Sequence, residues 1–181
     1  MLLMPSPSLS NILFLDIETV PQYADYSDLP EEWKKLWDHK ASFLIRNKDD
    51  ETFNSIYNKA GIYAEFGKIV CIGCGIISGQ GDEKKLAGKK PWEVNLIDTM
   101  ELWKFGDFKS YTSLNLLAYS LAIPTPKDDI DGSIVWEVYW KEHNLQRIVT
   151  YCQKDVITLA QVFLRMTGVS FIKQSHIEYK S

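Results

Sequence analysis

Two kinds of apolar pattern alternate along this chain, and the alternation constrains its fold more than any other feature. Short apolar runs that contain β-branched residues have the length of buried strands, as at Asn11–Ile17. Longer segments repeat apolar residues every three or four positions, which is typical of helices that bury one face. We predict strands at 11–17, 67–77 and 93–98, and helices at 29–45, 51–59, 111–123, 134–143 and 145–166. Strands that alternate with helices predict an α/β fold with a mainly parallel central sheet.

The length of 181 residues is enough for one α/β domain with a sizeable core. We expect a single domain over 1–181, a helical insertion at 21–66 after the first strand, and a tail or edge strand at 169–181. No apolar run reaches the ~18–20 residues that a membrane span needs. The N-terminus also lacks the basic segment of a secretory signal. These observations predict a cytoplasmic protein without a membrane partner.

The net charge of −4, from 20 basic and 24 acidic residues, argues weakly against binding through a broad basic surface. It does not exclude an enzyme that acts on nucleic acid, because a site for divalent metals uses several carboxylates as ligands. Lysines between the second and third predicted strands could attract phosphate, although a solvated loop explains them better. These lysines are Lys84, Lys85, Lys89 and Lys90.

Cys71 and Cys74 form a C-x-x-C pattern inside the predicted strand 67–77. Positions three apart on a strand point to opposite faces, so these two thiols cannot share a metal ion. We interpret them as small buried thiols of a core strand. In the same strand, Gly73 and Gly75 lack the third glycine and the helix start of a dinucleotide-binding loop, so we expect no nucleotide cofactor.

Asp16 and Glu18 stand near the end of the first predicted strand. Residues two apart on a strand face the same way, so both carboxylates project from one side. Their neighbours Phe14, Leu15 and Ile17 indicate burial, and two buried carboxylates repel each other unless a cation neutralises them. Hard divalent ions take oxygen ligands of this kind. The pair is therefore a candidate metal site, with solvated acids at a strand end as the alternative.

Tyr151 and Asp155 lie four residues apart in the longest predicted helix and so share one face of it. Taken alone, the pair is better explained as a core aromatic residue and a surface acid. The apolar positions that bury much of this helix are Ile148, Val149, Cys152, Val156 and Leu159.

Taken together and in this order, the two pairs are far more specific. Phe-Leu-Asp-Ile-Glu-Thr around Asp16 and Tyr-x-x-x-Asp at Tyr151 resemble the first and third motifs of the DEDD exonucleases, the proofreading-exonuclease superfamily on a ribonuclease H-like fold. The tyrosine marks the subclass called DEDDy; the sister subclass has a histidine where this chain has Thr150. Segments 65–73 and 95–103 look like a bacterial stand-alone branch related to the exonuclease domain of family-B DNA polymerases.

The resemblance implies a ribonuclease H-like three-layer fold with a mixed central sheet. It also implies a 3′–5′ exonuclease that uses two divalent cations, Mg²⁺ or Mn²⁺. In that family pattern Asp16 bridges both ions, Glu18 and Asp155 complete the tighter site, and Tyr151 orients the attacking water. Asp98, at the end of a predicted strand, is a possible neighbour of the site without a ligand role. The implied substrate is the 3′ end of single-stranded nucleic acid, with DNA expected before RNA.

The family's second motif, an aspartate on a helix, has no counterpart between Ile77 and Val94. The nearest candidates, Asp82 and Glu83, lie in a polar turn. The resembled fold places a third strand, a crossover helix and the motif helix in this interval, and one parallel crossover alone takes a dozen or more residues. We therefore predict that this part of the fold is missing and that the natural chain has further residues here. The predicted junction is near Lys85–Leu86, with consecutive Cα atoms much more than about 3.8 Å apart.

The missing carboxylate keeps another class of function open. The chain could be a catalytically inactive module of the same fold that binds nucleic acid or a protein partner. An exoribonuclease that acts on structured RNA is a third possibility, since discrimination of the 2′-hydroxyl depends on the shape of the pocket.

Overall fold

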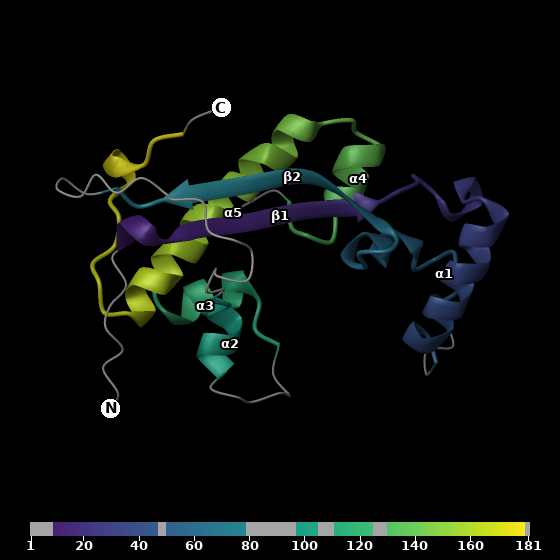
Figure 1. Cartoon of the computed structure of the whole chain (residues 1–181), viewed down its shortest axis with the longest axis horizontal. Helices are drawn as coiled ribbons and strands as arrows, with labels where there is room; N and C mark the ends of the chain where they lie inside the picture. The colour runs from purple at the N-terminus through teal and green to yellow at the C-terminus, as the bar shows by residue number, and fades with distance from the viewer. Residues whose placement is uncertain (1–8, 47–49, 79–96, 105–110, 125–129, 180–181) are drawn as a thin grey trace. The chain divides into compact units, whose positions relative to one another are not determined.

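The computed structural model describes residues 9–46, 50–78, 97–104, 111–124 and 130–179 (Figure 1). Its strands are β1 (Leu13–Pro21) and β2 (Gly67–Ile76). Its α-helices are α1 (Glu31–Leu44), α2 (Thr99–Lys104), α3 (Leu114–Ser120), α4 (Val135–Trp140) and α5 (Leu145–Met166). Short 3-10 helices stand at Leu9–Asn11, Tyr26–Asp28, Tyr57–Ile62 and Gln174–His176. The mixture of helices and strands confirms the α/β class.

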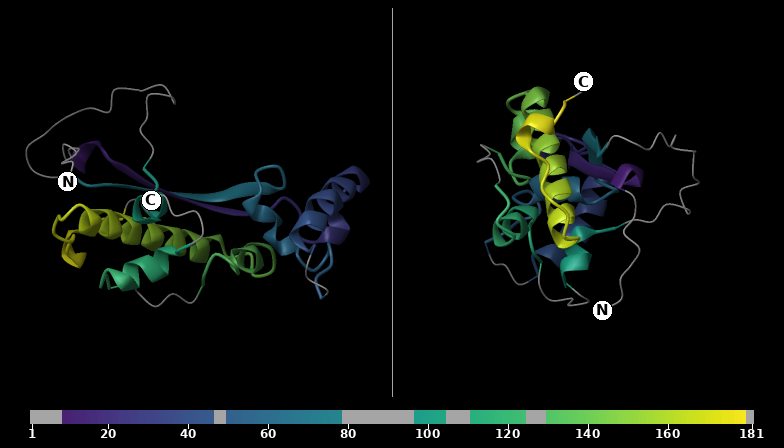
Figure 2. Two further views of the ribbon diagram at one scale, coloured as in Figure 1. Left: turned by 90° about the horizontal axis from the view of Figure 1, so that it is seen from below. Right: turned by 90° about the vertical axis from the view of Figure 1, so that its left-hand side faces the viewer.

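The two strands form a small sheet in which β1 pairs with β2. They lie side by side and run in opposite directions (Figures 1 and 2). This antiparallel pair is compatible with the mixed sheet that the resemblance implies, and the mainly parallel sheet predicted from the alternation stays a prediction. Most of the predicted strand 93–98 falls within 79–96, outside the described residues. The ribonuclease H-like arrangement therefore stays a prediction.

Most predicted helices are confirmed, with α5 matching its predicted bounds at both ends. The helix predicted at 51–59 is wrong, because this stretch forms turns that lead into the 3-10 helix Tyr57–Ile62. Here the Ser55 amide donates to Thr52 Oγ1 and the Thr52 amide to Ser55 Oγ, at 3.1 and 2.8 Å. Such local side-chain bonds offer the backbone an alternative to helical hydrogen bonds.

Two smaller differences concern segments that flank the matched helices. The short helix α2 was not predicted from the sequence. The segment predicted as a tail or edge strand forms no strand over 169–179, and contains only the 3-10 helix Gln174–His176.

The chain divides into two compact units, one of residues 17–73 and 128–152, the other of 1–16, 74–127 and 153–181. The strands β1 and β2 and the helix α5 each contribute residues to both units. The prediction of a single domain over 1–181 stays a prediction.

Within the first of these units, the segment 21–66, which the sequence predicts to be a helical insertion, has an aromatic core around Trp37. This residue is fully buried on α1. The Trp37 ring meets Tyr57 and Phe66 edge-on, with ring centroids 5.4 and 5.3 Å away. Its indole nitrogen donates to the Phe53 carbonyl at 2.8 Å, so its one polar group is paired inside the core. The insertion core comprises Leu29, Trp37, Ala41, Ile56, Tyr57, Ala60 and Phe66.

The end of β1 is held in the same unit by α4 and the start of α5. Val20 packs with Ile148 and Tyr151 in one buried cluster, and the Trp140 indole donates to the Pro21 carbonyl at 3.1 Å. A Cβ atom on Gly61 would lie 2.8 Å from the carbonyl carbon of Val20. Only glycine permits that approach, which ties the insertion to the end of β1.

In the other unit, the later turns of α5 pack against the strands and against α3. Phe14 of β1 meets Phe163 edge-on at 5.8 Å, and Val156 and Ala160 complete this cluster. Val162, on another side of the helix, packs with Leu117 of α3 and its neighbours. Because α5 is covered on more than one side, its rotation about its own axis is fixed.

No helix in the part of the chain that the structure describes is long and apolar enough to cross a membrane. The cytoplasmic location stays a prediction.

Candidate functional site

The strand β1 presents alternate residues to two different environments. Phe14, Glu18 and Val20 are buried and Asp16 is half-buried, so these four residues share the packed side. Glu18 keeps only 8% of its surface exposed, although it is a carboxylic acid. Charged groups are seldom buried so deeply without a partner. The alternation of buried and exposed residues along β1 thus agrees with the prediction that Asp16 and Glu18 project from the same side.

The other side of β1 differs from the expectation. Leu15 and Ile17 were expected to help bury the acids, but their side chains are 44% and 43% exposed, and Leu13 is 54% exposed. The continuous apolar run predicted a strand covered on both faces, whereas the structure covers the face that carries Asp16 and Glu18. The helix α5 lies at this face, because the ligand atom of its residue Cys152 is within 4.8 Å of those of both acids.

The helix α5 places the second predicted pair. Tyr151 is buried, with 9% of its surface exposed, among Val20, Ile148 and their neighbours. Asp155 is half-buried one turn later on the same helix. Tyr151 thus takes the core position that the sequence allowed, while Asp155 is more buried than a solvated surface acid.

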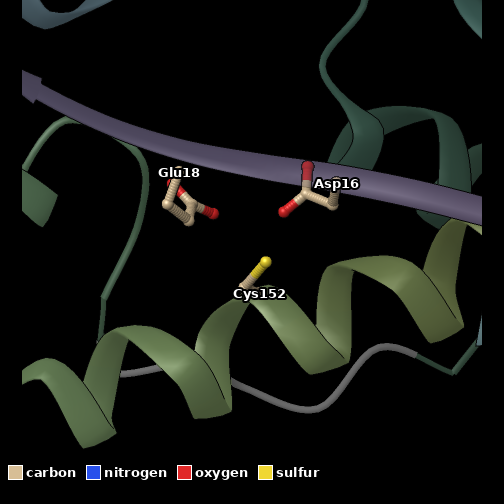
Figure 3. Close-up of side chains that lie close together, drawn as sticks. All are labelled: Asp16, Glu18 and Cys152. Carbon is tan, nitrogen blue, oxygen red and sulfur yellow. The ribbon is translucent and has the colours of Figure 1, made fainter. Parts of the chain in front are cut away.

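Three potential metal ligands come together at this point (Figure 3). Asp16 and Glu18 on β1 and Cys152 on α5 each offer one ligand atom, and these atoms all lie within 4.8 Å of one another. In Figure 3 the carboxylates and the thiol are turned toward the same space. The cysteine side chain is fully buried. One ion could reach all three donors with small side-chain movements.

The donor set decides which ions fit. Carboxylate oxygens are the ligands that Mg²⁺ and Mn²⁺ prefer, so Asp16 and Glu18 fit the ions implied by the family resemblance. The thiol of Cys152 is a softer ligand, which suits Zn²⁺ and other thiophilic ions. The site therefore combines two kinds of donor.

Sequence reasoning found the two carboxylates and missed the cysteine. It counted Cys152 among the apolar residues that bury the helix, which the structure bears out for its burial. The sequence could have pointed to Cys152 through its position, because it directly follows Tyr151 on a helix that also carries Asp155. We also expect Tyr151 and Asp155 to share one open cleft with the two acids, with the carboxylates of Asp16 and Asp155 no more than ~10 Å apart, and this stays a prediction.

Two other predicted positions now have a defined local structure. Asp98 accepts hydrogen bonds from the backbone amides of Met100 and Glu101 at 2.8 and 3.4 Å. It therefore caps the start of α2, and its placement near the site stays a prediction. Both cysteines of β2 were predicted to be buried. Cys71 is only half-buried, and the prediction is wrong for Cys74, which is exposed.

The remaining predictions fall on residues 79–96, outside the described residues. They concern Asp82 and Glu83 as candidates for the second motif, and the solvated loop proposed for the lysines at 84, 85, 89 and 90. They also include the junction near Lys85–Leu86, whose Cα spacing is therefore not tested.

The model of a family described as a predicted 3′-5′ exonuclease related to the exonuclease domain of PolB matches residues 86–177. The match includes Tyr151 and Asp155 and begins beyond Asp16 and Glu18. No curated protein and no solved structure matches the chain.

Proposed function

Because this chain belongs to the family of predicted 3′–5′ exonucleases related to the exonuclease domain of PolB, we propose that it hydrolyses phosphodiester bonds at the 3′ end of single-stranded nucleic acid. The observation that supports the proposal is a short distance between two parts of the chain that are far apart in sequence. Asp16 and Glu18, which lie outside the family match, have ligand atoms within 4.8 Å of Cys152, which lies inside it. Cys152 is the residue next to Tyr151, which supports the proposal that the first and third motifs form one site.

We assign the metal ligands as Asp16, Glu18 and Asp155. Two bound Mg²⁺ or Mn²⁺ ions would activate the attacking water and stabilise the leaving 3′ oxygen. The chain's own contribution is to place the carboxylates and to hold the scissile phosphate in line. The Tyr151 hydroxyl, on a helix that packing holds fixed, orients the water. We propose DNA as the substrate because the family is described as related to the exonuclease domain of PolB.

A degradation assay tests this proposal with the full chain. The protein, with Mg²⁺ or Mn²⁺, is incubated with 5′-labelled single-stranded DNA and RNA oligomers of the same sequence. We expect stepwise shortening from the 3′ end that stops when the metal is chelated. DNA should be shortened faster than RNA, and equal or reversed rates would overturn the substrate assignment alone.

Three variants separate the site from the rest of the surface. Asp16→Ala removes the proposed bridging ligand and should abolish nearly all activity. Tyr151→Phe should retain metal binding and slow the reaction, because only the hydroxyl is lost. Glu32→Ala is the matched control, since the Glu32 side chain is 81% exposed on α1. Equal rates for Asp16→Ala and Glu32→Ala would show that the activity comes from a contaminating nuclease.

The second candidate function is a catalytically inactive module of the same family that binds nucleic acid or a protein partner. It is favoured by one observation, the lack of a second-motif aspartate between Ile77 and Val94. Binding of single-stranded oligomers without any shortening, at every divalent ion tried, would support this candidate and overturn the exonuclease.

A further inference from the structure

The proposed exonuclease site contains a ligand that hard metal ions do not use. We propose that Cys152, together with Asp16 and Glu18, forms a binding site for Zn²⁺ or another thiophilic divalent ion. The regulatory part of this inference rests on the proposed function, because a Zn²⁺ ion bound there would occupy the position assigned to Mg²⁺ or Mn²⁺. Zinc would thereby regulate the same site.

The geometry supports three bonds to one ion. Zinc binds thiolate sulfur at about 2.3 Å and carboxylate oxygen at about 2.0–2.2 Å. In a tetrahedral site, two such donors on the same ion are therefore about 3.3–3.7 Å apart. The donor atoms of Asp16, Glu18 and Cys152 lie within 4.8 Å of one another, so small side-chain movements bring all three into range. Three protein ligands leave a fourth position open, as in zinc sites that bind water or substrate.

The chemistry of the donors sets the preference among ions. An all-oxygen site suits Mg²⁺ and Mn²⁺, whereas a thiolate ligand favours Zn²⁺. Zinc also binds mixed sites more tightly than Mn²⁺ does in the general order of divalent affinities. The thiol proton of Cys152 is released to solvent as the bond to the metal forms. This chain should therefore bind Zn²⁺ at concentrations well below those of Mn²⁺ that fill the same site.

A simpler explanation is that Cys152 only fills space in the core, as buried cysteines often do. The chain supplies its own comparison, because it has three cysteines in all. Cys71 and Cys74 lie on β2, and neither belongs to a group of three metal-ligating residues within the described part of the chain. If Cys152 binds a metal ion, its thiolate gives a charge-transfer absorption, whereas a space-filling cysteine gives none. Removing the two other cysteines assigns any such absorption to Cys152.

The test is metal binding seen through the thiolate, with Co²⁺ as the spectroscopic substitute for Zn²⁺. The full chain is titrated with Co²⁺ and the thiolate-to-metal charge-transfer absorption is recorded, followed by displacement with Zn²⁺. We expect one equivalent of Co²⁺ to give this absorption in the wild type and in the Cys71→Ser/Cys74→Ser protein. Cys152→Ser and Cys152→Ala should lack it, and Asp16→Asn should bind Co²⁺ at least tenfold more weakly.

The double variant keeps Cys152 as its single cysteine, so it assigns the absorption even where the Cys152 variants do not fold. Absence of charge transfer in that protein, or its persistence in folded Cys152→Ser, overturns the proposal. The nuclease assay distinguishes the two proposals. Shortening of DNA with Mn²⁺ but no thiolate absorption refutes the zinc site alone, whereas thiolate absorption without any nuclease activity refutes the exonuclease alone.

Discussion

The insertion core around Trp37 and the strand β1 bury their apolar residues in opposite ways. The insertion core is closed, with Trp37, Ala41 and Ala60 fully buried among aromatic neighbours. The strand is covered on the side that carries Phe14 and Glu18, and exposed on the side that carries Leu13, Leu15 and Ile17. A closed core can hold its structure by its own packing. The strand depends on α5, and that dependence keeps its acids beside a helix.

The largest effect should come from breaking the closed core. Trp37→Ala removes the central ring and the hydrogen bond to Phe53, and should lower the free energy of unfolding by about 3–5 kcal/mol. Urea unfolding followed by circular dichroism measures this change. A loss below about 1 kcal/mol would show that the insertion is not packed around Trp37.

A smaller effect is expected on the covered side of the sheet. A Cβ atom on Gly75 would lie 2.8 Å from Cγ1 of Val156 on α5, so Gly75→Ala should cost about 1–3 kcal/mol through overpacking. Adding Val156→Ala makes room for the new methyl group. In a double-mutant cycle, Gly75→Ala should therefore cost less in the Val156→Ala background. Additive effects of the two substitutions would mean that this contact does not hold the strand to the helix.

The sequence predicted the elements around the site better than their surroundings. The bounds of α5 follow from a long regular repeat of apolar residues, and the same-side placement of Asp16 and Glu18 follows from strand geometry. The exposure of Leu15 could not be predicted, because a continuous apolar run does not show which face a partner covers.

The role of Cys152 was hidden for a related reason. Burial of a cysteine is equally explained by packing and by metal binding, and only the distances to Asp16 and Glu18 separate the two. The turns at 51–56 were missed because local hydrogen bonds of Thr52 and Ser55 outweigh a weak helical pattern.

Alkaline pH offers a milder test of the insertion. Burial, and then the hydrogen bond that Tyr26 donates to Asp38 at 2.8 Å, raise the pKa of Tyr26 from 10.0 to about 12. Tyr26 is neutral in both states below pH 10, and between pH 10 and about 12 the unfolded chain ionises first. The free energy of unfolding should therefore fall as the pH rises through this window.

Tyr26→Phe removes the titrating group and should make the decrease over that window shallower than in the wild type. Chemical unfolding at a series of pH values measures both slopes. Parallel curves for the two proteins would rule out a contribution from Tyr26, and would assign the remaining decrease to other tyrosines such as Tyr57, whose pKa burial also raises.

The smallest effect is expected on the exposed side of β1. Leu15→Thr should change the free energy of unfolding by no more than about 0.5 kcal/mol, because the side chain is already 44% exposed. Phe14→Ala, on the covered side, is the matched comparison and should cost about 3–5 kcal/mol. A loss above about 2 kcal/mol for Leu15→Thr would show that this side is covered as well, and would end the contrast with the insertion core.

The packing of α5 on more than one side has a consequence for how this gene can change over generations. Each added residue in an α-helix turns everything beyond it by about 100°. A single codon inserted between Ile148 and Tyr151 would carry Cys152 away from Asp16 and Glu18 and expose Phe163 and Val162 at the same time. Substitutions along this helix can be tolerated one by one, whereas a change in its length is removed by selection at once. Within lineages that retain this packing, the spacing from Ile148 to Phe163 should therefore be invariant even where the residues between them differ.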